Sequence, residues 1–361
     1  MAKRNDKLVL ASEVKNTQDF ICPGCLQLVL LRRGSVKIAH FAHLKSGCNM
    51  FAENESQLHL GGKKSLLQMA QNWDPAAQLE TTFDEVKQRA DIYLPTVKLA
   101  LEYQCSPINQ DRLQQRTQGY SQMGVQVVWI LGNPYLSQRL TTQTLTKFAR
   151  FDVNLGFYLV FWDAKRTRFV LWADIIEVAG QYEYHESQYV SYQELKQFLQ
   201  QCSFYQRRVT LKEKLKQLTT INNQIQMKNK TLVFMVTQCY QVGRILPACP
   251  LICHPSEAQF PIFGCQTLFW RILVTIKMFE RDSQGILKTE LNQIYTETIQ
   301  EYGLTFYQII NFKRFYRLAF LQYLQELTAA GYLKQTYDKV IIIKRPEWFE
   351  DWEQKRANWS N

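Results

Sequence analysis

The sequence lacks any hydrophobic run long enough to cross a membrane, which argues against an integral membrane protein. The apolar residues 8–11 are too short for the core of a signal peptide, and Glu13 interrupts them. Nine cysteines are an odd number, and several lie in apolar patterns, so a disulfide framework is not indicated. We therefore expect a cytoplasmic protein without membrane insertion, whose cysteines are metal ligands or small buried residues.

Acidic residues are in short supply. The 361 residues contain 43 Lys and Arg but 32 Asp and Glu, for a net charge of +11. This excess favours an anionic partner, with nucleic acid ahead of a membrane surface. Residues 1–52 and 151–361 each carry a net +5, whereas residues 53–150 carry +1. We expect three domains with these boundaries, the acidic chemistry being in the middle one.

A cluster of candidate metal ligands follows the N-terminus, with the spacing C-x2-C-x14-H-x2-H-x4-C over Cys22, Cys25, His40, His43 and Cys48. A Cys-Pro-Gly-Cys turn presents two thiolates to one ion, and a second pair downstream closes a tetrahedral site. Four of the five residues would bind a structural Zn²⁺. We prefer Cys22, Cys25, His43 and Cys48, and keep His40 as the alternative. The module would be zinc-finger-like, with zinc supplying much of its folding free energy.

Two carboxylates and an amide in the middle region predict a second kind of metal site. Asp91 lies in one expected strand, and Glu102 and Gln104 lie two residues apart in the next, so the last two leave the same face. A hairpin brings Asp91 beside them, where the oxygens suit Mg²⁺ or Mn²⁺. The alternative is that both carboxylates are ordinary exposed strand residues. The pattern is that of D…(D/E)-x-K nucleases, with Gln104 in place of the lysine.

The order of expected elements agrees with this interpretation: a helix, three strands, a helix and a strand at residues 53–73, 78–83, 88–94, 97–104, 111–123 and 125–131. That order is typical of the restriction-endonuclease-like, or PD-(D/E)xK, α/β fold. On the first helix, Glu55, His59 and Lys63 share a face. Such a face is commonly just solvated; the functional alternative is that Glu55 reaches the metal while His59 and Lys63 approach the DNA phosphate. Arg116 and Tyr120 of the second helix are further candidate DNA contacts.

Residues 151–361 predict a β-hairpin near 151–172 followed by a mainly helical region. Residues 196–230 contain eight Lys and Arg and one acid, Glu213. A run of one sign is either a solvated face or a phosphate contact, and we take Arg207, Arg208, Lys212 and Lys216 as DNA-binding candidates. Residues 288–346 resemble a winged helix. The cysteines of the proline-rich loop 246–265 match no zinc spacing and are expected to be buried or free thiols.

Taken together, these motifs resemble the CoiA family of competence proteins: Cys22 to Cys25, His40 to His43, Glu55, His59, Lys63, Asp91, Glu102 to Gln104, Arg116, Tyr120 and the strand 128–131. The resemblance covers residues 10–135. It implies a nuclease-like domain, a role in recombining imported single-stranded DNA during natural transformation, and work beside the RecA recombinase and its loader DprA. By resemblance, Asp91 and Glu102 are metal ligands, Gln104 completes the motif and Glu55 is the helix carboxylate.

Three functions follow as hypotheses. The first is a metal-dependent DNA nuclease in which Asp91 and Glu102 hold the catalytic cation. The second is a DNA-binding recombination mediator that keeps the fold but cleaves weakly or not at all, since the neutral amide of Gln104 cannot supply the charge of a lysine. The third is a protein-interaction scaffold.

Overall fold

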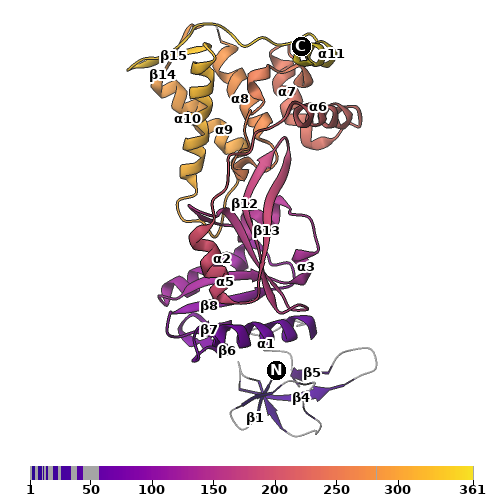
Figure 1. Cartoon of the computed structure of the whole chain (residues 1–361), viewed down its shortest axis with the longest axis vertical. Coiled ribbons are helices and arrows are strands. Elements are labelled where there is room, and N and C mark those ends of the chain that lie inside the picture. Colours follow the sequence, from indigo (N-terminus) through magenta and orange to yellow (C-terminus); the bar gives the residue numbers. More distant parts are fainter. Residues whose placement is uncertain are drawn as a thin grey trace. The chain divides into compact units, whose positions relative to one another are not determined.

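The protein is described here by a computed structural model (Figure 1), covering residues 2–4, 7–9, 11, 14, 19–22, 26–33, 39–43, 57–281 and 283–360. The chain divides into two compact units. The first comprises Met1–Arg139, Val160–Val170 and Gln188–Glu194, and the second comprises Leu140–Leu159, Leu171–Ser187 and Leu195–Asn361.

The N-terminal region contains a small antiparallel sheet of order β2-β1-β3-β4-β5. Its strands are β1 (Ala2–Arg4), β2 (Lys7–Val9), β3 (Phe20–Ile21), β4 (Leu28–Arg32) and β5 (His40–His43). A small core of Ala2, Val14, Phe20, Cys22 and Val29 holds it together, and Phe41 packs on this core. The predicted zinc ligands Cys25 and Cys48, and the side chain of His40, lie outside the described residues.

The next segment follows the predicted order of elements. These are α1 (Gln57–Gln71), β6 (Gln78–Phe83), β7 (Gln88–Leu94), β8 (Leu99–Gln104), α2 (Gln110–Gln122) and β9 (Gln126–Leu131). Strands β6, β7 and β8 form an antiparallel meander, and β9 pairs with β8 in parallel. Asn109 caps α2 by accepting a hydrogen bond from the backbone N–H of Arg112, and Gly124 follows the helix at a left-handed φ of 65°. The α/β class is therefore confirmed.

Strands predicted as a separate hairpin belong to the same sheet. They are β10 (Arg150–Asp152), β11 (Gly156–Asp163), β12 (Arg168–Val178) and β13 (Gln181–Tyr189), and the sheet order is β13-β12-β11-β9-β8-β7-β6, with β10 paired to β11. Strand β11 pairs with β9 in parallel at Phe161 and Leu131. Because β9 is apolar on both faces and mostly buried, it suits a central position in the sheet, with both faces covered. Short helices α3 (Asn133–Leu136) and α4 (Thr142–Phe148) precede β10.

The remainder is mainly helical, as predicted, with α5 (Tyr192–Gln201), α6 (Leu211–Gln226), α7 (Val233–Gln241), α8 (Thr267–Phe279), α9 (Lys288–Tyr302), α10 (Lys313–Ala329) and α11 (Trp352–Ser360). The predicted helical stretch 191–237 breaks before Thr210, which forms a capping box with Glu213 and starts α6 afresh. Helix α8 is buried over almost its whole length. After it come β14 (Gly285–Leu287), α9, α10, β15 (Leu333–Gln335) and β16 (Lys339–Ile342), with sheet order β14-β16-β15.

Among the described residues, no helix combines the length and the apolar character needed to span a bilayer.

Candidate functional site

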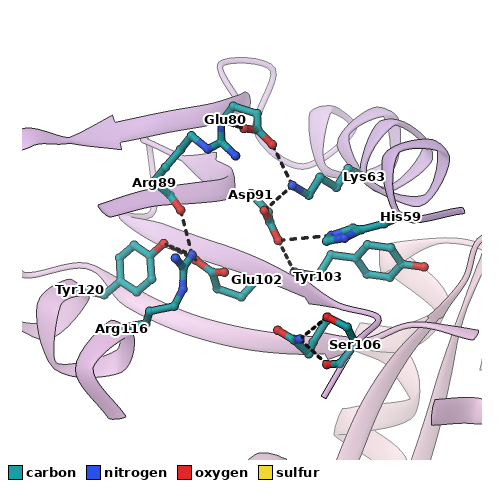
Figure 2. Close-up of polar contacts among 11 residues, drawn as sticks. His59, Lys63, Glu80, Arg89, Asp91, Glu102, Tyr103, Ser106, Arg116 and Tyr120 are labelled. Carbon is teal, nitrogen blue, oxygen red and sulfur yellow. Dashed lines mark hydrogen bonds and ion pairs between the residues drawn. The ribbon is translucent and has the colours of Figure 1, made fainter. Parts of the chain in front are cut away.

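Three carboxylates lie in one row across strands β6, β7 and β8. Leu79 pairs with Ile92 and Thr81 pairs with Ala90, so Glu80 and Asp91 occupy the positions between these pairs. Ile92 also pairs with Leu101, which puts Asp91 and Glu102 at the next position of that ladder. We call Glu80, Asp91 and Glu102 the carboxylate row, and Figure 2 shows it with the cations around it.

Glu80 is the member that the sequence did not reveal. It is buried, and its backbone has a left-handed φ of 59°, a region that residues other than glycine seldom adopt. Its Oε1 lies 2.8 Å from Lys63 Nζ. Its Oε2 lies 2.5 Å from Arg89 Nη1. This contact is an ion pair whose angles do not make it a hydrogen bond. The only sequence signal was that Glu80 is the one charged residue of its strand, and a glutamate in a strand is usually exposed to solvent.

Lys63 bridges two members of the row from helix α1. Its Nζ lies 2.7 Å from Asp91 Oδ1 as well as near Glu80, and its side chain has no exposed surface. The approach of α1 depends on Gly62, because a Cβ atom there would collide with the ring of Tyr103 on β8. The glycine next to Lys63 therefore lets the lysine reach a sheet that would otherwise be held further away.

Asp91 is held in its ionised form. Its Oδ2 accepts a hydrogen bond of 2.9 Å from the backbone N–H of Tyr103 and lies 3.9 Å from His59 Nε2. Burial acts to raise the pKa of Asp91, but Lys63, His59 and Arg116 outweigh it and bring the pKa well below its ordinary range. Asp91 is thus a stable anion at neutral pH.

Glu102 has the opposite electrostatics on the neighbouring strand. Burial raises the pKa of Glu102 to about 7, and the nearby charge of Asp91 adds to the effect, although Arg116 opposes both. Arg116 Nη2 lies 2.5 Å from Glu102 Oε1, and the hydroxyl of Tyr120 donates to the same oxygen. Arg116 also donates to the backbone carbonyl of Arg89 over 2.8 Å. The two predicted metal ligands therefore differ in how readily they take up a proton near neutral pH.

Gln104 does not join Asp91 and Glu102 in the structure. Its Nε2 donates to the backbone carbonyl of Ser106 over 2.5 Å, and that carbonyl also accepts from Tyr135 Oη over 2.9 Å. The amide is therefore used to hold the loop after β8. The lysine that contacts Asp91 is Lys63, from helix α1.

The residues predicted to contact DNA around this site contact its carboxylates instead. Lys63 and His59 face Asp91, and Arg116 and Tyr120 face Glu102 (Figure 2). Glu55, the predicted helix carboxylate, lies outside the described residues.

The predicted Mg²⁺ or Mn²⁺ ion would share the row with cations of the chain itself. A hard cation needs free anionic oxygens, but Lys63 already neutralises Asp91 and Arg116 already neutralises Glu102. Counting Glu80 and Arg89, three cations face three carboxylates. Within the part of the chain that the structure describes, no three His, Cys, Asp or Glu side chains are grouped to hold a metal. A divalent ion would compete with these cations for the carboxylates.

The second set of predicted DNA contacts lies near the start of α6. Arg207 forms ion pairs with Glu183, at 3.2 Å, and with Glu213. Its charge is thus balanced within the protein. Arg208, Lys212 and Lys216 are exposed.

Two of the three cysteines of the loop before α8, Cys249 and Cys253, are buried, and Cys265 is half-buried. Lys355 of α11 has no exposed surface, and its Nζ lies 3.0 Å from Cys249 Sγ and 2.9 Å from His254 Nε2. The ammonium group therefore contacts both the thiol and the imidazole, which are 3.7 Å apart.

Two family descriptions match the chain. "Competence protein CoiA, N-terminal domain" matches residues 4–51, and "Competence protein CoiA, nuclease-like domain" matches residues 55–203. The second match extends through β13, in agreement with the single large sheet. Competence protein CoiA of Bacillus subtilis (strain 168) is 34% identical over 135 residues, which cover 36% of this chain and 34% of that protein. No solved structure matches the chain.

The chain belongs to the CoiA family of competence proteins, and it contains that family's nuclease-like domain. The matched part spans about a third of the length of the Bacillus subtilis relative.

Proposed function

We propose that this member of the CoiA family binds DNA and promotes recombination of the single strand imported during natural transformation, with cleavage weak or absent. The observation that carries the proposal is the neutralised carboxylate row. Each of Glu80, Asp91 and Glu102 has a cationic partner from the chain itself. In such a site a catalytic cation must compete with the chain's own cations for the carboxylates, which weakens its binding.

DNA binding rests on two further properties. The net charge of +11 provides the long-range attraction to a phosphate backbone. The family description places a nuclease-like domain over residues 55–203, and such a scaffold is compatible with a nucleic-acid partner. The imported single strand, or a recombination intermediate formed from it, is the substrate we propose.

A metal-dependent nuclease is the second candidate, and one observation favours it. Asp91 and Glu102 lie side by side on adjacent strands of a nuclease-like domain. Lys63 contacts Asp91, one of the two carboxylates that would bind the catalytic cation. If DNA binding drew Lys63 and Arg116 toward a phosphate, both carboxylates would be free for Mg²⁺ or Mn²⁺.

The two candidates are separated by incubating the purified full chain with labelled single- and double-stranded DNA in Mn²⁺, Mg²⁺ or EDTA. We expect binding without substantial cleavage in all three. We also expect Asp91→Ala to lower the melting temperature in EDTA, because Lys63 loses one of its two carboxylates. Asp84→Ala, which removes an exposed carboxylate, is the matched control and should leave the melting temperature unchanged.

Efficient cleavage that needs Mn²⁺ and disappears in Asp91→Ala would replace the mediator with the nuclease. Gln104→Lys is informative in the same assay: a rise in cleavage would mean that position 104 can still serve the site, despite its bond to Ser106. A chain that binds neither form of DNA would remove both candidates.

The partners RecA and DprA are part of the same proposal. If the chain acts as a mediator, adding it to a RecA strand-exchange reaction on protein-coated single strands should increase the rate, with and without DprA. An unchanged rate in both reactions would remove the mediator role and leave DNA binding alone.

We also propose a structural Zn²⁺ in the N-terminal region, and the register of the small sheet supports one choice of ligands. Cys22 follows Ile21, which pairs with Leu28, and His43 pairs with the neighbouring Val29. Cys22 and His43 thus lie at the same end of the sheet. His40 pairs with Arg32 at the other end, which favours His43 as the ligand beside Cys22, Cys25 and Cys48.

Metal analysis of protein purified without chelator should find about one zinc per chain. His43→Ala should lose the zinc and destabilise the region, whereas His40→Ala should retain it. Zinc-free protein, or loss of zinc only in His40→Ala, would contradict this ligand set.

A further inference from the structure

The hairpin formed by β15, the turn at residues 336–338 and β16, which we call the wing, presents an aromatic ring at its tip. Tyr337 is 92% exposed. The turn beneath it is rigid, because the backbone N–H of Thr336 donates to the carbonyl of Lys339 over 2.9 Å and Thr336 Oγ1 donates to Asp338 Oδ1 over 3.0 Å. The exposure of the ring is therefore built into the hairpin and does not come from a loose loop.

The first turn of α9 supports the same tip. The backbone N–H of Lys288 donates to the carbonyl of Asp338, and Lys288 Nζ lies 4.8 Å from the centroid of the Tyr337 ring. A cation at this distance from an aromatic face is attracted to it. The turn that carries Tyr337 is thus bonded to α9, and Lys288 lies against one face of the exposed ring.

The outer surface of the wing is basic. Along its strands Leu333 and Val340 are buried, whereas Lys334 and Lys339 are exposed. Asp338 is the one acid of the hairpin, and its pKa is lowered by its bond to Thr336 and by the charges of Lys339 and Lys288. Lys288, Lys334 and Lys339 outnumber Asp338, and Glu290 of the first turn of α9 is paired with Arg281, so this surface is positive.

A positive surface around an exposed, preset aromatic ring is what single-stranded nucleic acid requires, since phosphates need cations and unpaired bases need a stacking partner. Tyr205, in the same unit of the chain, makes the contrast. It is 94% exposed, but the neighbouring Arg207 is paired with Glu183 and Glu213. Exposure alone does not distinguish the two rings, but Tyr337 has the cation Lys288 at its face.

We propose that the wing is a binding site for single-stranded DNA, in which Tyr337 stacks on an unpaired base while Lys288, Lys334 and Lys339 contact the phosphates on either side. The inference rests on the DNA binding proposed above and adds its location. It assigns this contact to the region after α8, outside the match to the nuclease-like domain.

The test compares two tyrosine variants of the full chain by fluorescence anisotropy with a fluorescein-labelled oligothymidine. Tyr337→Ala should bind about tenfold more weakly, on the scale of one lost base stack, and Tyr337→Phe should bind like the unchanged protein. Tyr205→Ala is the matched control and should also bind normally. Both tyrosines are too exposed for folding to change, which equal melting temperatures would verify.

Two further measurements separate stacking from charge. The loss in Tyr337→Ala should be much smaller on the same oligonucleotide annealed to its complement, because paired bases are not available to the ring. Lys339→Met should reduce the salt dependence of single-strand binding by about 0.7 in the log–log slope. Photocrosslinking of a bromouracil-substituted strand should map to the peptide that contains Tyr337.

Normal binding by Tyr337→Ala, or an equal loss on single strands and duplex, would overturn the proposed stacking site. Failure of the unchanged protein to bind the oligothymidine at all would instead overturn the DNA-binding function on which the site depends.

Discussion

Lys63 in the nuclease-like region and Lys339 in the wing are the same residue type in opposite surroundings. Lys63 has no exposed surface and lies between two carboxylates, whereas Lys339 is exposed beside a single acid. A buried charge must be paired, since its desolvation costs several kcal/mol, but an exposed one remains solvated and free to exchange partners. The comparison teaches that residues resembling a catalytic motif can be committed to the fold, while available charge lies elsewhere.

Two tyrosines show the same contrast between a buried, paired group and an exposed one. The Tyr120 hydroxyl is buried against Glu102, and burial, with the charge of that carboxylate, raises the pKa of Tyr120 far above its ordinary value. Tyr337 is open to solvent. The first tyrosine stabilises a carboxylate, and the second can meet a ligand.

The largest expected effect is that of Lys63→Met. This change leaves Glu80 and Asp91 buried with less compensation, and should lower the free energy of unfolding by about 3–5 kcal/mol. Urea unfolding at neutral pH measures it. Lys87→Met, which removes an exposed lysine, is the control. A loss no larger than that of the control would mean that the row is not a structural unit.

A double substitution sharpens this result. If Lys63 is required chiefly to neutralise its partners, then Glu80→Gln should recover part of the stability lost in Lys63→Met. The coupling free energy should lie at about 1–3 kcal/mol, the range for residues in one ion-pair network. Additive losses in the double-mutant cycle would show that Lys63 and Glu80 act independently, contrary to their 2.8 Å contact.

The neighbouring carboxylates should respond to pH with opposite signs. The pKa of Glu102 rises from 4.5 to about 7 on folding, so ionising it costs stability as pH increases through that interval. Glu102→Gln should therefore be more stable than the unchanged protein at pH 8, on the order of 1–3 kcal/mol, and similar to it at pH 4.5. Thermal melts at the two values measure the difference.

Asp91→Asn is the companion of opposite sign. The lowered pKa of Asp91 adds stability that is present above its ordinary value of 3.8 and is lost as pH falls through the folded value. This variant should be destabilised at pH 8. If both variants shift in the same direction at pH 8, the assignment of one stable anion and one readily protonated acid is wrong.

The smallest expected effect completes the comparison. Lys339→Met in the wing should change the free energy of unfolding by no more than about 0.5 kcal/mol, because the side chain is exposed and its charge is solvated. Urea unfolding, as for Lys63→Met, measures this change. A loss close to that of Lys63→Met would mean that the wing lysines, too, are structural.

Much of the fold was predictable because the middle region has clear local signals. Asn109 before a helix, Gly124 after it and the apolar run of β9 are local chemistry, and the structure has them as expected. The large sheet was predicted too small, since the parallel pairing of β9 with β11 joins Leu131 to Phe161 across a long connection. No local pattern carries that information.

By itself, the sequence determined the element order from α1 to β9, the family and the positions of Asp91 and Glu102 on adjacent strands. Local propensity and alternation are properties of neighbouring residues. Only the tertiary structure decided what those carboxylates face: Lys63 from a helix that Gly62 lets approach, Arg116 from another helix, and Glu80 from a third strand. Whether a charge is free or neutralised depends on burial and on partners distant in the chain, and both are set when the elements pack.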